Sequence, residues 1–488
     1  MRTNKLFLSS TVLLSLFGAL ACTNEENPNV PTGPTSEVVL KNQSTTPALA
    51  KAMPGFENLE IYSLIGSDDK LDQSPAFVFG GSADGSGILK NTDGTYTMLV
   101  NHEDNFAVSR ITLDKTFKPV KGEYILNSDG GLWRLCSATM ATQEEHGFGP
   151  LYLTSGESGE ESRTHGVNPR ADVGSAGISK EIAGLGRWSA ENAVPLPKQA
   201  YSGKTIVLIG DDDSAVNGGQ VAMYVSNTVG DLENGSLYML KRSDNNQKEM
   251  DMKVGTKYPV EFVQVENHKT LTGAQINAKV NDLKAIKFGR VEDVDYRKKS
   301  TGREVYFNVT GQATSQANAD YSRSKYGRVY RLTLNDADPL KGSLEVILDG
   351  DDRNGPAKAF QNVDNICVTE NYLYTQEDPN GYGDETHDSY IYQLNLKTNE
   401  LKPVLAVDPR RTAADAAKYN VGGSSKFGAW EYGSLIDVSD VIGVPNTFTL
   451  AVQPHTWTDA KYAGVDGGSK RKDEKQASQI LVIKGLPR

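Results

Sequence analysis

Gly235-Ser-Leu-Tyr-Met-Leu240, Gly327-Arg-Val-Tyr-Arg-Leu332 and Ser389-Tyr-Ile-Tyr-Gln-Leu394 are three versions of one short pattern. Each begins with a small residue, places an aliphatic residue before a tyrosine, and closes on leucine, as expected for a β-strand bounded by a turn. A strand type that recurs along a long chain predicts radially repeated sheets. We therefore predict an all-β fold, a β-propeller of six blades with loop and short helical insertions. A two-domain β-sandwich is the alternative.

Other short apolar runs between Gly, Asp and Asn residues extend this prediction, and helical periodicity is rare. Strands are expected at Tyr96–Val100, Leu151–Leu153, Thr205–Ile209, Val221–Val225, Glu304–Asn308, Leu344–Leu348, Tyr372–Tyr374 and Thr447–Val452, in addition to the three strands above. The best helix candidates are Ala274–Lys284 and Thr412–Lys418.

The first 22 residues have the features of an export signal. Arg2 and Lys5 are basic, and the apolar run over residues 6–17 is too short to span a bilayer. The ending Ala19-Leu20-Ala21-Cys22 resembles a lipobox, in which the cysteine is lipidated and becomes the new N-terminus. Ordinary cleavage beside an incidental cysteine is the alternative. We predict a signal peptide over 1–21 and lipidation at Cys22.

Residues 22–52 are rich in Thr, Asn, Pro, Ser and Glu. Such a segment buries too little apolar surface to offset its ordering entropy, so it is interpreted as a lipidated flexible tether. Residues 53–488 would then form the propeller domain. The expected protein is an exported monomer, anchored to the outer membrane by its lipid and facing the periplasm or the cell surface.

The net charge of −11 argues against nucleic acid as a partner and suits a site that holds cations. After Cys22 only Cys136 and Cys367 remain, so the chain is not a disulfide scaffold. A single bridge between these two cysteines would need a proximity that the sequence does not show.

Five glutamates are spread along the chain at the ends of expected strands, about one for each predicted blade. They are Glu103, Glu157, Glu191, Glu292 and Glu431. Loops at one end of all blades converge on the axis of a propeller, so these carboxylates can meet there. Ca²⁺ takes six to eight oxygen ligands, which such a ring supplies. Any one glutamate taken alone is interpreted as a surface charge, and the prediction depends on the set.

Two further side chains extend the candidate site. Cys136 is either a small buried apolar residue or a thiolate ligand, and a thiolate among carboxylates favours a transition metal. Arg290 stands two residues before Glu292, on the same face of a strand. It either forms a salt bridge with that glutamate or binds phosphate oxygens. The run Asp211-Asp212-Asp213 is interpreted as a turn, and no serine-hydrolase elbow or P-loop is present.

Taken in order, several segments resemble the PhoX-type alkaline phosphatases, bacterial β-propeller enzymes that depend on calcium and iron. The matching segments are Tyr96-Thr-Met-Leu-Val-Asn-His-Glu103, the block from Cys136 to Glu157, Leu185-Gly-Arg-Trp-Ser-Ala-Glu191, Ile206 to Asp212, Arg290-Val-Glu-Asp-Val294, Val363-Asp-Asn-Ile366, Glu431-Tyr-Gly433 and Gln453-Pro-His455. The order of the segments carries the resemblance, which extends over about residues 55–485.

The resemblance implies a role for each candidate residue. Cys136, Glu157 and Glu191 would lie at an iron-containing part of a metal cluster, and Glu292, Glu431 and Glu103 would hold calcium. Arg290 would contact the phosphate of the substrate. The implied activity is metal-dependent hydrolysis of phosphate monoesters of small molecules outside the cytoplasm, with several Ca²⁺ ions and Fe³⁺ as cofactors.

This sequence departs from the family pattern at four framework positions. Ala138 and Thr139 replace two glycines, Ala190 replaces a histidine, and Val291 replaces a proline. Two alternatives therefore stay open, because a fold does not fix its chemistry. One is a non-catalytic propeller lipoprotein that binds a glycan or a protein, and the other is a phosphodiesterase or lactonase on the same scaffold.

Overall fold

The computed structural model describes residues 37–488, which form a compact unit. The predicted signal peptide, the lipidation site Cys22 and the first part of the predicted tether lie outside the described residues. No helix within residues 37–488 has both the length and the apolar character needed to cross a membrane.

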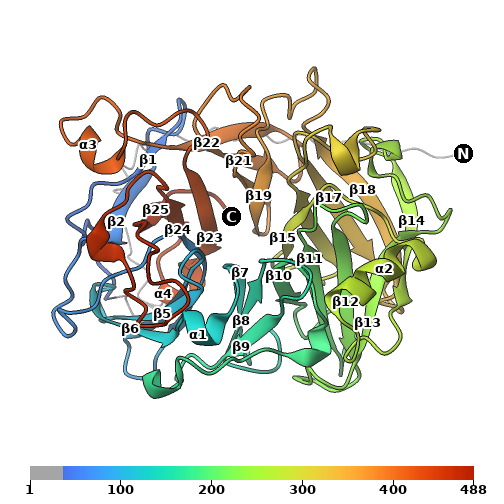
Figure 1. Cartoon of the computed structure of the whole chain (residues 1–488), viewed down its shortest axis with the longest axis horizontal. Helices are drawn as coiled ribbons and strands as arrows, with labels where there is room; N and C mark the ends of the chain where they lie inside the picture. Colours follow the sequence, from blue (N-terminus) through green and yellow to red (C-terminus); the bar gives the residue numbers. More distant parts are fainter. Residues whose placement is uncertain (1–36) are drawn as a thin grey trace, which may run out of the picture. The chain divides into compact units, whose positions relative to one another are not determined.

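The described residues form six antiparallel strand meanders arranged around a central axis (Figure 1). In chain order the meanders contain β3 (Ala83–Lys90), β4 (Tyr96–His102), β5 (Ala107–Leu113) and β6 (Pro119–Leu126); β7 (Leu135–Ala141), β8 (Leu151–Gly156) and β9 (Thr164–Val167); β10 (Ala190–Pro195), β11 (Thr205–Asp211), β12 (Gln220–Ser226), β13 (Ser236–Arg242) and β14 (Lys257–Gln264); β15 (Val291–Tyr296), β16 (Glu304–Val309), β17 (Arg328–Leu334) and β18 (Lys341–Asp349); β19 (Val363–Val368), β20 (Tyr372–Glu377), β21 (Tyr390–Asn395) and β22 (Leu401–Val407); and β23 (Glu431–Asp437), β24 (Thr447–Gln453) and β25 (Gln479–Lys484). Two more strands, β1 (Ala50–Ala52) and β2 (Glu60–Gly66), complete the fifth and sixth meanders.

The first strand of each meander is the innermost one, and the six innermost strands close a ring. β3 packs against β7, β7 against β10, β10 against β15, β15 against β19, β19 against β23, and β23 against β3. The third and fourth meanders also join at their outer edges, where β14 pairs with β18, so hydrogen bonding merges them into one nine-stranded sheet. The predicted all-β propeller is confirmed, and the ring contains six blades.

Strands from the two ends of the described chain complete the last blades. β2 pairs with β25 in the sixth blade, and β1 pairs with β22 as the outer strand of the fifth. The sequence analysis assigned residues up to 52 to the tether, whereas residues 37–52 belong to the compact unit. Leu49 and Ala50 are buried between the fifth and sixth blades, which the polar composition of the whole segment does not reveal. The domain therefore begins before residue 53.

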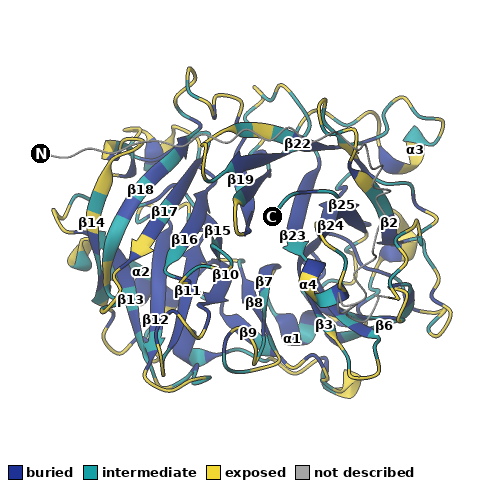
Figure 2. Cartoon of the chain, turned by 180° about the vertical axis from the view of Figure 1, so that it is seen from behind, coloured by how far each residue is buried: buried dark blue, intermediate teal, exposed yellow. Residues whose placement is uncertain are grey.

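The hydrophobic core is divided into six clusters, one between each pair of neighbouring blades. The cluster between the third and fourth blades, for example, contains Leu208 and Met223 from one blade and Phe307 and Tyr330 from the other. Apolar residues on both faces of each sheet are therefore removed from water, which is the main stabilising term. Figure 2 shows the result, with the strands around the axis almost entirely buried.

Helices are few and short. They are α1 (Ser128–Gly131), α2 (Gly273–Leu283), α3 (Ala416–Tyr419) and α4 (Ser439–Ile442), with single 3₁₀ turns at Val173–Ser175, Ala183–Leu185, Glu249–Asp251, Gln316–Asn318 and Ala460–Tyr462. The predicted helix over 274–284 is confirmed as α2, which begins with a reciprocal capping box between Thr272 and Gln275. The second helix candidate is reduced to the single turn α3.

All eleven predicted strands are present as β4, β8, β11, β12, β13, β16, β17, β18, β20, β21 and β24. None of them is an innermost strand. Sequence patterns therefore found the second strand of every blade and several third and fourth strands, and they missed the strands that surround the axis.

A polar network around the buried His146 and Tyr296 lies beside a cavity of about 620 Å³ at one end of the axis. The backbone N–H of Thr142 donates to Nδ1 of His146, so the neutral ring carries its proton on Nε2, which faces the hydroxyl of Tyr296. That hydroxyl donates to Glu145, and the ammonium of Lys298 lies over the Tyr296 ring. Burial lowers the pKa of His146 to about 4, although the charge of Glu145 opposes this shift.

We expect this histidine to make the fold acid-sensitive. Its pKa is lower in the folded state than the ordinary value of 6.5, so the unfolded chain binds the extra proton first and stability is lost as the pH falls from 6.5 towards 4. The loss attributable to His146 is about 3 kcal/mol. Denaturant unfolding of wild type and His146→Asn between pH 7 and 4 measures it, and the variant should show the shallower pH dependence. Parallel curves would contradict the assignment.

Candidate metal centre

The end of the axis opposite the 620 Å³ cavity is lined by acidic residues from the beginnings of the innermost strands. These residues are Asp84 on β3, Cys136 on β7, Glu191 on β10, Glu292 on β15, Asp364 on β19 and Glu431 on β23. Each is the first or second residue of its strand. The ring of strands thus places one potential metal ligand from every blade around a single axial cavity of about 270 Å³.

Backbone irregularities lie at all of these side chains except Glu431, which stands just before one. Each innermost strand pairs with the second strand of its blade through a shifted register near its beginning. In the first blade, for example, regular pairing is interrupted between Ala83 and Ser86, which leaves Asp84 in the bulge. Bulges bend a strand and re-aim its side chains, and they are frequent next to active sites.

A second set of ligands comes from the ends of the second strands. Because neighbouring strands in a blade are antiparallel, the end of the second strand lies beside the beginning of the first. Glu103 follows β4, Glu157 follows β8, Asp212 follows β11 and Asp378 follows β20. Of these, Glu103, Glu157 and Asp378 line the axial cavity together with the first set.

Two glycines allow the innermost strands to approach one another closely. A Cβ atom on Gly85 would lie 2.5 Å from the carbonyl oxygen of Cys136, and one on Gly433 would lie 2.5 Å from the Cα of Asp84. Real side chains do not tolerate such contacts, so any other residue there would push apart the strands that carry the ligands.

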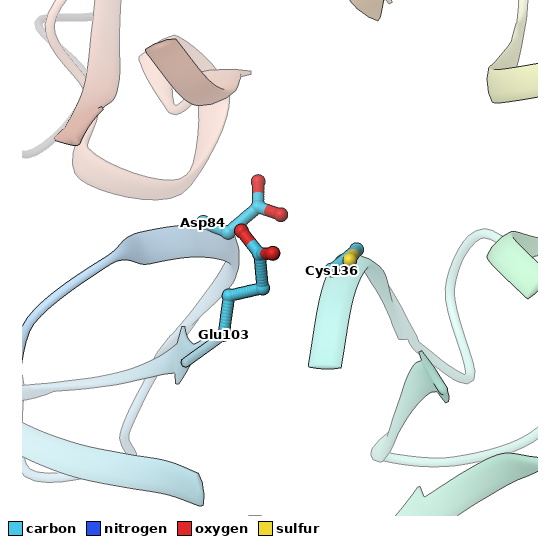
Figure 3. Close-up of side chains that lie close together, drawn as sticks. All are labelled: Asp84, Glu103 and Cys136. Carbon is cyan, nitrogen blue, oxygen red and sulfur yellow. The ribbon is translucent and has the colours of Figure 1, made fainter. Parts of the chain in front are cut away.

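Three groups of side chains bring their ligand atoms within 4.8 Å of one another. The groups are Asp84, Glu103 and Cys136; Cys136, Glu157 and Glu191; and Glu191, Glu292 and Asp364. The first and second groups share Cys136, and the second and third share Glu191, so the three form one continuous cluster. Figure 3 shows the first group, with the two carboxylates of the first blade close together and Cys136 facing them from the second blade.

Hydrogen bonds hold several of these side chains in place. The thiol of Cys136 donates to Glu157 (3.2 Å), and the backbone N–H of Ser137 donates to Glu191 (3.2 Å). Glu103 accepts from Gln453 (3.1 Å) and pairs with Arg134 (2.9 Å). These contacts fix the side chains from β7 and from the loops around it before any cation binds.

Glu431, the ligand from the sixth blade, is hydrogen-bonded to His455. The Nε2 atom of His455 lies 3.0 Å from the Glu431 carboxylate, and its Nδ1 atom lies 2.6 Å from the side-chain oxygen of Gln476. The amide of Gln476 donates to Asp104, which orients its oxygen towards the histidine.

The fold holds the acidic groups of the cluster close together although their charges repel one another, and this shows in their pKa values. Burial first, and then the charges of neighbouring carboxylates, raise the pKa of Asp84, Glu191, Glu292 and Asp364 well above the ordinary value. The same two causes raise the pKa of Cys136. Like charges in a buried cavity cannot all ionise without a compensating cation.

Arg290 lies at the edge of this cavity in a fixed orientation. Its guanidinium forms two hydrogen bonds with Asp212 (2.6 and 3.0 Å), pairs with Glu292 (3.1 Å) and donates to Asn380 (2.6 Å). Burial would lower the pKa of Arg290, but Asp212 and Glu292 raise it well above the ordinary value. Its backbone has a φ of +73°, a conformation that is strained for a residue with a side chain and that often occurs at functional sites.

The structure brings the six predicted metal ligands and Arg290 to one cavity. Cys136, Glu103, Glu157, Glu191, Glu292, Glu431 and Arg290 all line it. The sequence left two roles open for Arg290, a salt bridge with Glu292 or binding of phosphate oxygens. The structure is compatible with both, because Arg290 pairs with Glu292 and also lines the cavity. Cys136 and Cys367 are both free and buried, and they form no disulfide.

Sequence reasoning missed three acids of the cavity, Asp84, Asp364 and Asp378. It also interpreted Asp212 as a turn residue, although this residue clamps Arg290. A signal was present, because in the first, second and fifth blades the two ligands are one β-hairpin apart, as Asp84 and Glu103 are. Recognising it would have required the innermost strands, whose polar sequences do not resemble ordinary strands.

No protein-family model matches the chain, and no curated protein sequence matches it. Among solved structures, PhoX from Pseudomonas fluorescens in complex with vanadate, a transition state analogue, is similar with a TM-score of 0.59 and 14% identity, over 91% of this chain and 98% of that one. Aldose sugar dehydrogenase from Streptomyces coelicolor (TM-score 0.33, 10% identity, 87% and 98% covered) and an α-L-arabinofuranosidase of Fusarium graminearum (TM-score 0.36, 10% identity, 86% and 97% covered) are much less similar.

The fold and the cavity define a β-propeller with a potential metal centre on its axis. More particularly, the chain has a PhoX-like fold. At 14% identity this likeness concerns the fold alone.

The donor set of the cavity fits metal ions. Carboxylate oxygens dominate it, as hard cations require, and one thiol adds a softer ligand. Oδ1 of Asp84 is buried and has no hydrogen-bond partner among the described residues, which is a costly state for an oxygen that no cation contacts. The raised pKa values of the carboxylates also indicate a cation site, since bound cations would offset both the burial and the repulsion that raise them.

We expect Asp84→Asn to stabilise the metal-free protein and to weaken its response to calcium. The amide removes one of the mutually repelling charges at nearly constant volume, so the melting temperature in chelator should rise by about 2 °C. The calcium-induced increase in melting temperature should become smaller than in wild type. Thermal unfolding with chelator and with added Ca²⁺ measures both effects.

Asp336→Asn is the matched control, because Asp336 is an exposed partner of Arg303 far from the cluster. It should behave like wild type in both conditions. A lower melting temperature of Asp84→Asn in chelator would show that the acidic cluster does not destabilise the metal-free fold.

Proposed function

We propose that this protein hydrolyses phosphate monoesters outside the cytoplasm with the help of metal ions in the axial cavity. The single observation that carries the proposal is the position of Arg290, a fixed and partly exposed guanidinium, beside the buried carboxylate and thiol cluster. A cationic fork next to a metal centre suits a phosphate group. The shared fold with a PhoX structure that binds vanadate is consistent with this chemistry.

The side chains around the cavity would have different roles in the reaction. Arg290 would bind the non-bridging oxygens of the phosphate and stabilise their charge in the transition state. Asp212 and Asn380 would hold its guanidinium in the productive orientation, so little reorganisation accompanies the reaction. Metal ions bound in the cavity would supply charge neutralisation and an activated oxygen nucleophile.

The ligand set suggests which metals would bind. Glu292, Asp364 and Glu431 offer only oxygen atoms, which suits Ca²⁺. The group around Cys136 with Glu157 and Glu191 includes a thiol, which suits a transition metal such as Fe³⁺. We therefore propose several Ca²⁺ ions and an iron centre on the Cys136 side.

The location of the protein is part of the proposal. Export by the signal over residues 1–21 and lipidation at Cys22 would attach a monomeric propeller to the outer membrane. Its substrate would then be a phosphorylated small molecule in the periplasm or outside the cell, where a phosphatase releases phosphate for uptake.

Metal content and turnover test the proposal together. We expect purified protein to contain calcium and iron by plasma mass spectrometry and to hydrolyse p-nitrophenyl phosphate, with activity lost on chelation and restored by adding both metals. Absence of turnover after both metals are added back would contradict the phosphatase function. Bound calcium without turnover would instead favour a non-catalytic binding protein. Cleavage of a phosphodiester or a lactone would favour a phosphodiesterase or lactonase on the same scaffold.

Substitution of Arg290 tests its role. We expect Arg290→Lys to lower kcat/KM for p-nitrophenyl phosphate by about 10²-fold, because an ammonium cannot keep the contacts with Asp212 and Asn380 that hold the positive charge beside the phosphate. Metal content should stay near the wild-type level, since Arg290 is not among the ligand groups. Unchanged kcat/KM would show that Arg290 forms only the salt bridge with Glu292.

A further inference from the structure

A second hollow of about 500 Å³ opens beside the axial cavity. The two share Glu157 and Arg290 in their walls, so a molecule whose phosphate reaches Arg290 would extend into this hollow. The remaining wall comes from Gly159 after β8, Ser189 before β10, and the loops after β11, β16 and β20. These loops belong to the third, fourth and fifth blades.

The hollow is lined mainly by polar groups. Asp212, Asp213, Ser214, Gln312 and Asn380 contribute their side chains, together with Ser189. Among the described residues in its wall, only Ala313 and Tyr382 offer carbon-rich side chains. An alkyl or lipid group would therefore find little apolar surface there, and its burial would contribute little free energy.

The polar side chains are held in place by hydrogen bonds to the protein. Asn380 accepts from Arg290 and donates to the carbonyl of Gly311 (3.3 Å). Gln312 accepts from the buried Arg323 (2.9 Å) and donates to the carbonyl of Ser214 (3.4 Å). Their conformations are therefore fixed before a ligand arrives, which reduces the entropic cost of binding.

Several of these groups keep unused hydrogen-bonding capacity. An amide nitrogen has two N–H donors, and Gln312 uses only one of them, so it retains the other. The carboxylate of Asp213 accepts one bond on each oxygen, from Ala215 and Asn277, and keeps further lone pairs. The hydroxyl of the exposed Ser214 makes no hydrogen bond to any residue within 37–488. The wall of this one hollow thus offers both hydrogen-bond donors and hydrogen-bond acceptors.

Hydroxyl groups are the ligand atoms that match this wall, because each can donate to Asp213 and accept from an amide N–H at the same time. We propose that the hollow binds the hydroxyl-rich part of a phosphorylated sugar or polyol, with its phosphate at Arg290. The inference rests on the proposed function and names the substrate class of the same site. A sugar phosphate is preferred over an alkyl phosphate of equal carbon number.

Glucose 6-phosphate and hexyl phosphate are the matched probes, since both have six carbons and release a primary alcohol. We expect metal-loaded wild-type protein to hydrolyse glucose 6-phosphate with a kcat/KM about tenfold or more above that for hexyl phosphate, because two or more hydrogen bonds distinguish them. Ser214→Trp places a large side chain in the hollow from an exposed position, and it should bring the ratio of the two values close to one.

Calorimetric dissociation constants for the same two compounds provide a readout that does not need turnover. We expect tighter binding of glucose 6-phosphate to wild type and loss of this difference in Ser214→Trp. Glu144→Gln is the matched control, since Glu144 is exposed and lies beside the cavity at the other end of the axis. It should retain the wild-type ratio of rates and the wild-type difference in binding.

The outcomes separate this inference from the proposed function. Hydrolysis of both compounds with no preference, or with a preference for hexyl phosphate, would overturn the inference and leave the phosphatase function standing. Tighter binding of glucose 6-phosphate without hydrolysis of either compound would support the inference and overturn the phosphatase function. Failure to bind or hydrolyse either compound would overturn both.

Discussion

Electrostatic repulsion within the axial cavity is the constraint on which the rest of the structure depends. Eight carboxylates and one thiol line a space of about 270 Å³, and two arginines are the only cationic side chains of permanent charge in the wall that the structure describes. Such an arrangement is unfavourable in a buried environment unless cations neutralise it. The hydrophobic clusters between blades supply the stability that holds the acids together, since each blade is fixed by its neighbours on both sides.

The propeller converts a repeated local feature into one shared site. A single bulge at the beginning of a strand moves one side chain, such as Asp84, by a small distance. Repeated in blade after blade and closed into a ring, the same feature concentrates ligands from residue 84 to residue 431 on one axis. Closure by β2 and β25 is essential to this arrangement, because an open ring would let the charged edges separate.

The two ends of the axis differ in chemistry for a reason visible along each innermost strand. β15 has Glu292, its second residue, at the acidic cavity and ends with Tyr296 beside the larger cavity at the other end. Between them Asp293 is bonded to Asn192 and to the backbone of Ile366, so this carboxylate has a structural role in joining three blades. Acids that lack such protein partners, like Asp84, are the ones available to a cation.

The sequence alone determined the all-β class, the recurrence of one strand pattern along the chain and the identity of most candidate ligands. Outer strands such as β17 and β21 alternate apolar and polar residues, because one local periodicity is enough to bury a face of a sheet. Only the tertiary structure decided which residues surround the axis. The innermost strands carry bulges, glycines and buried acids, for example in Ala83-Asp-Gly-Ser86, and such residues are favourable in a strand only when five other blades enclose them. For the same reason Asp364 and Asp378 became recognisable as ligands, and Asp212 as the partner of Arg290, only once the ring was closed.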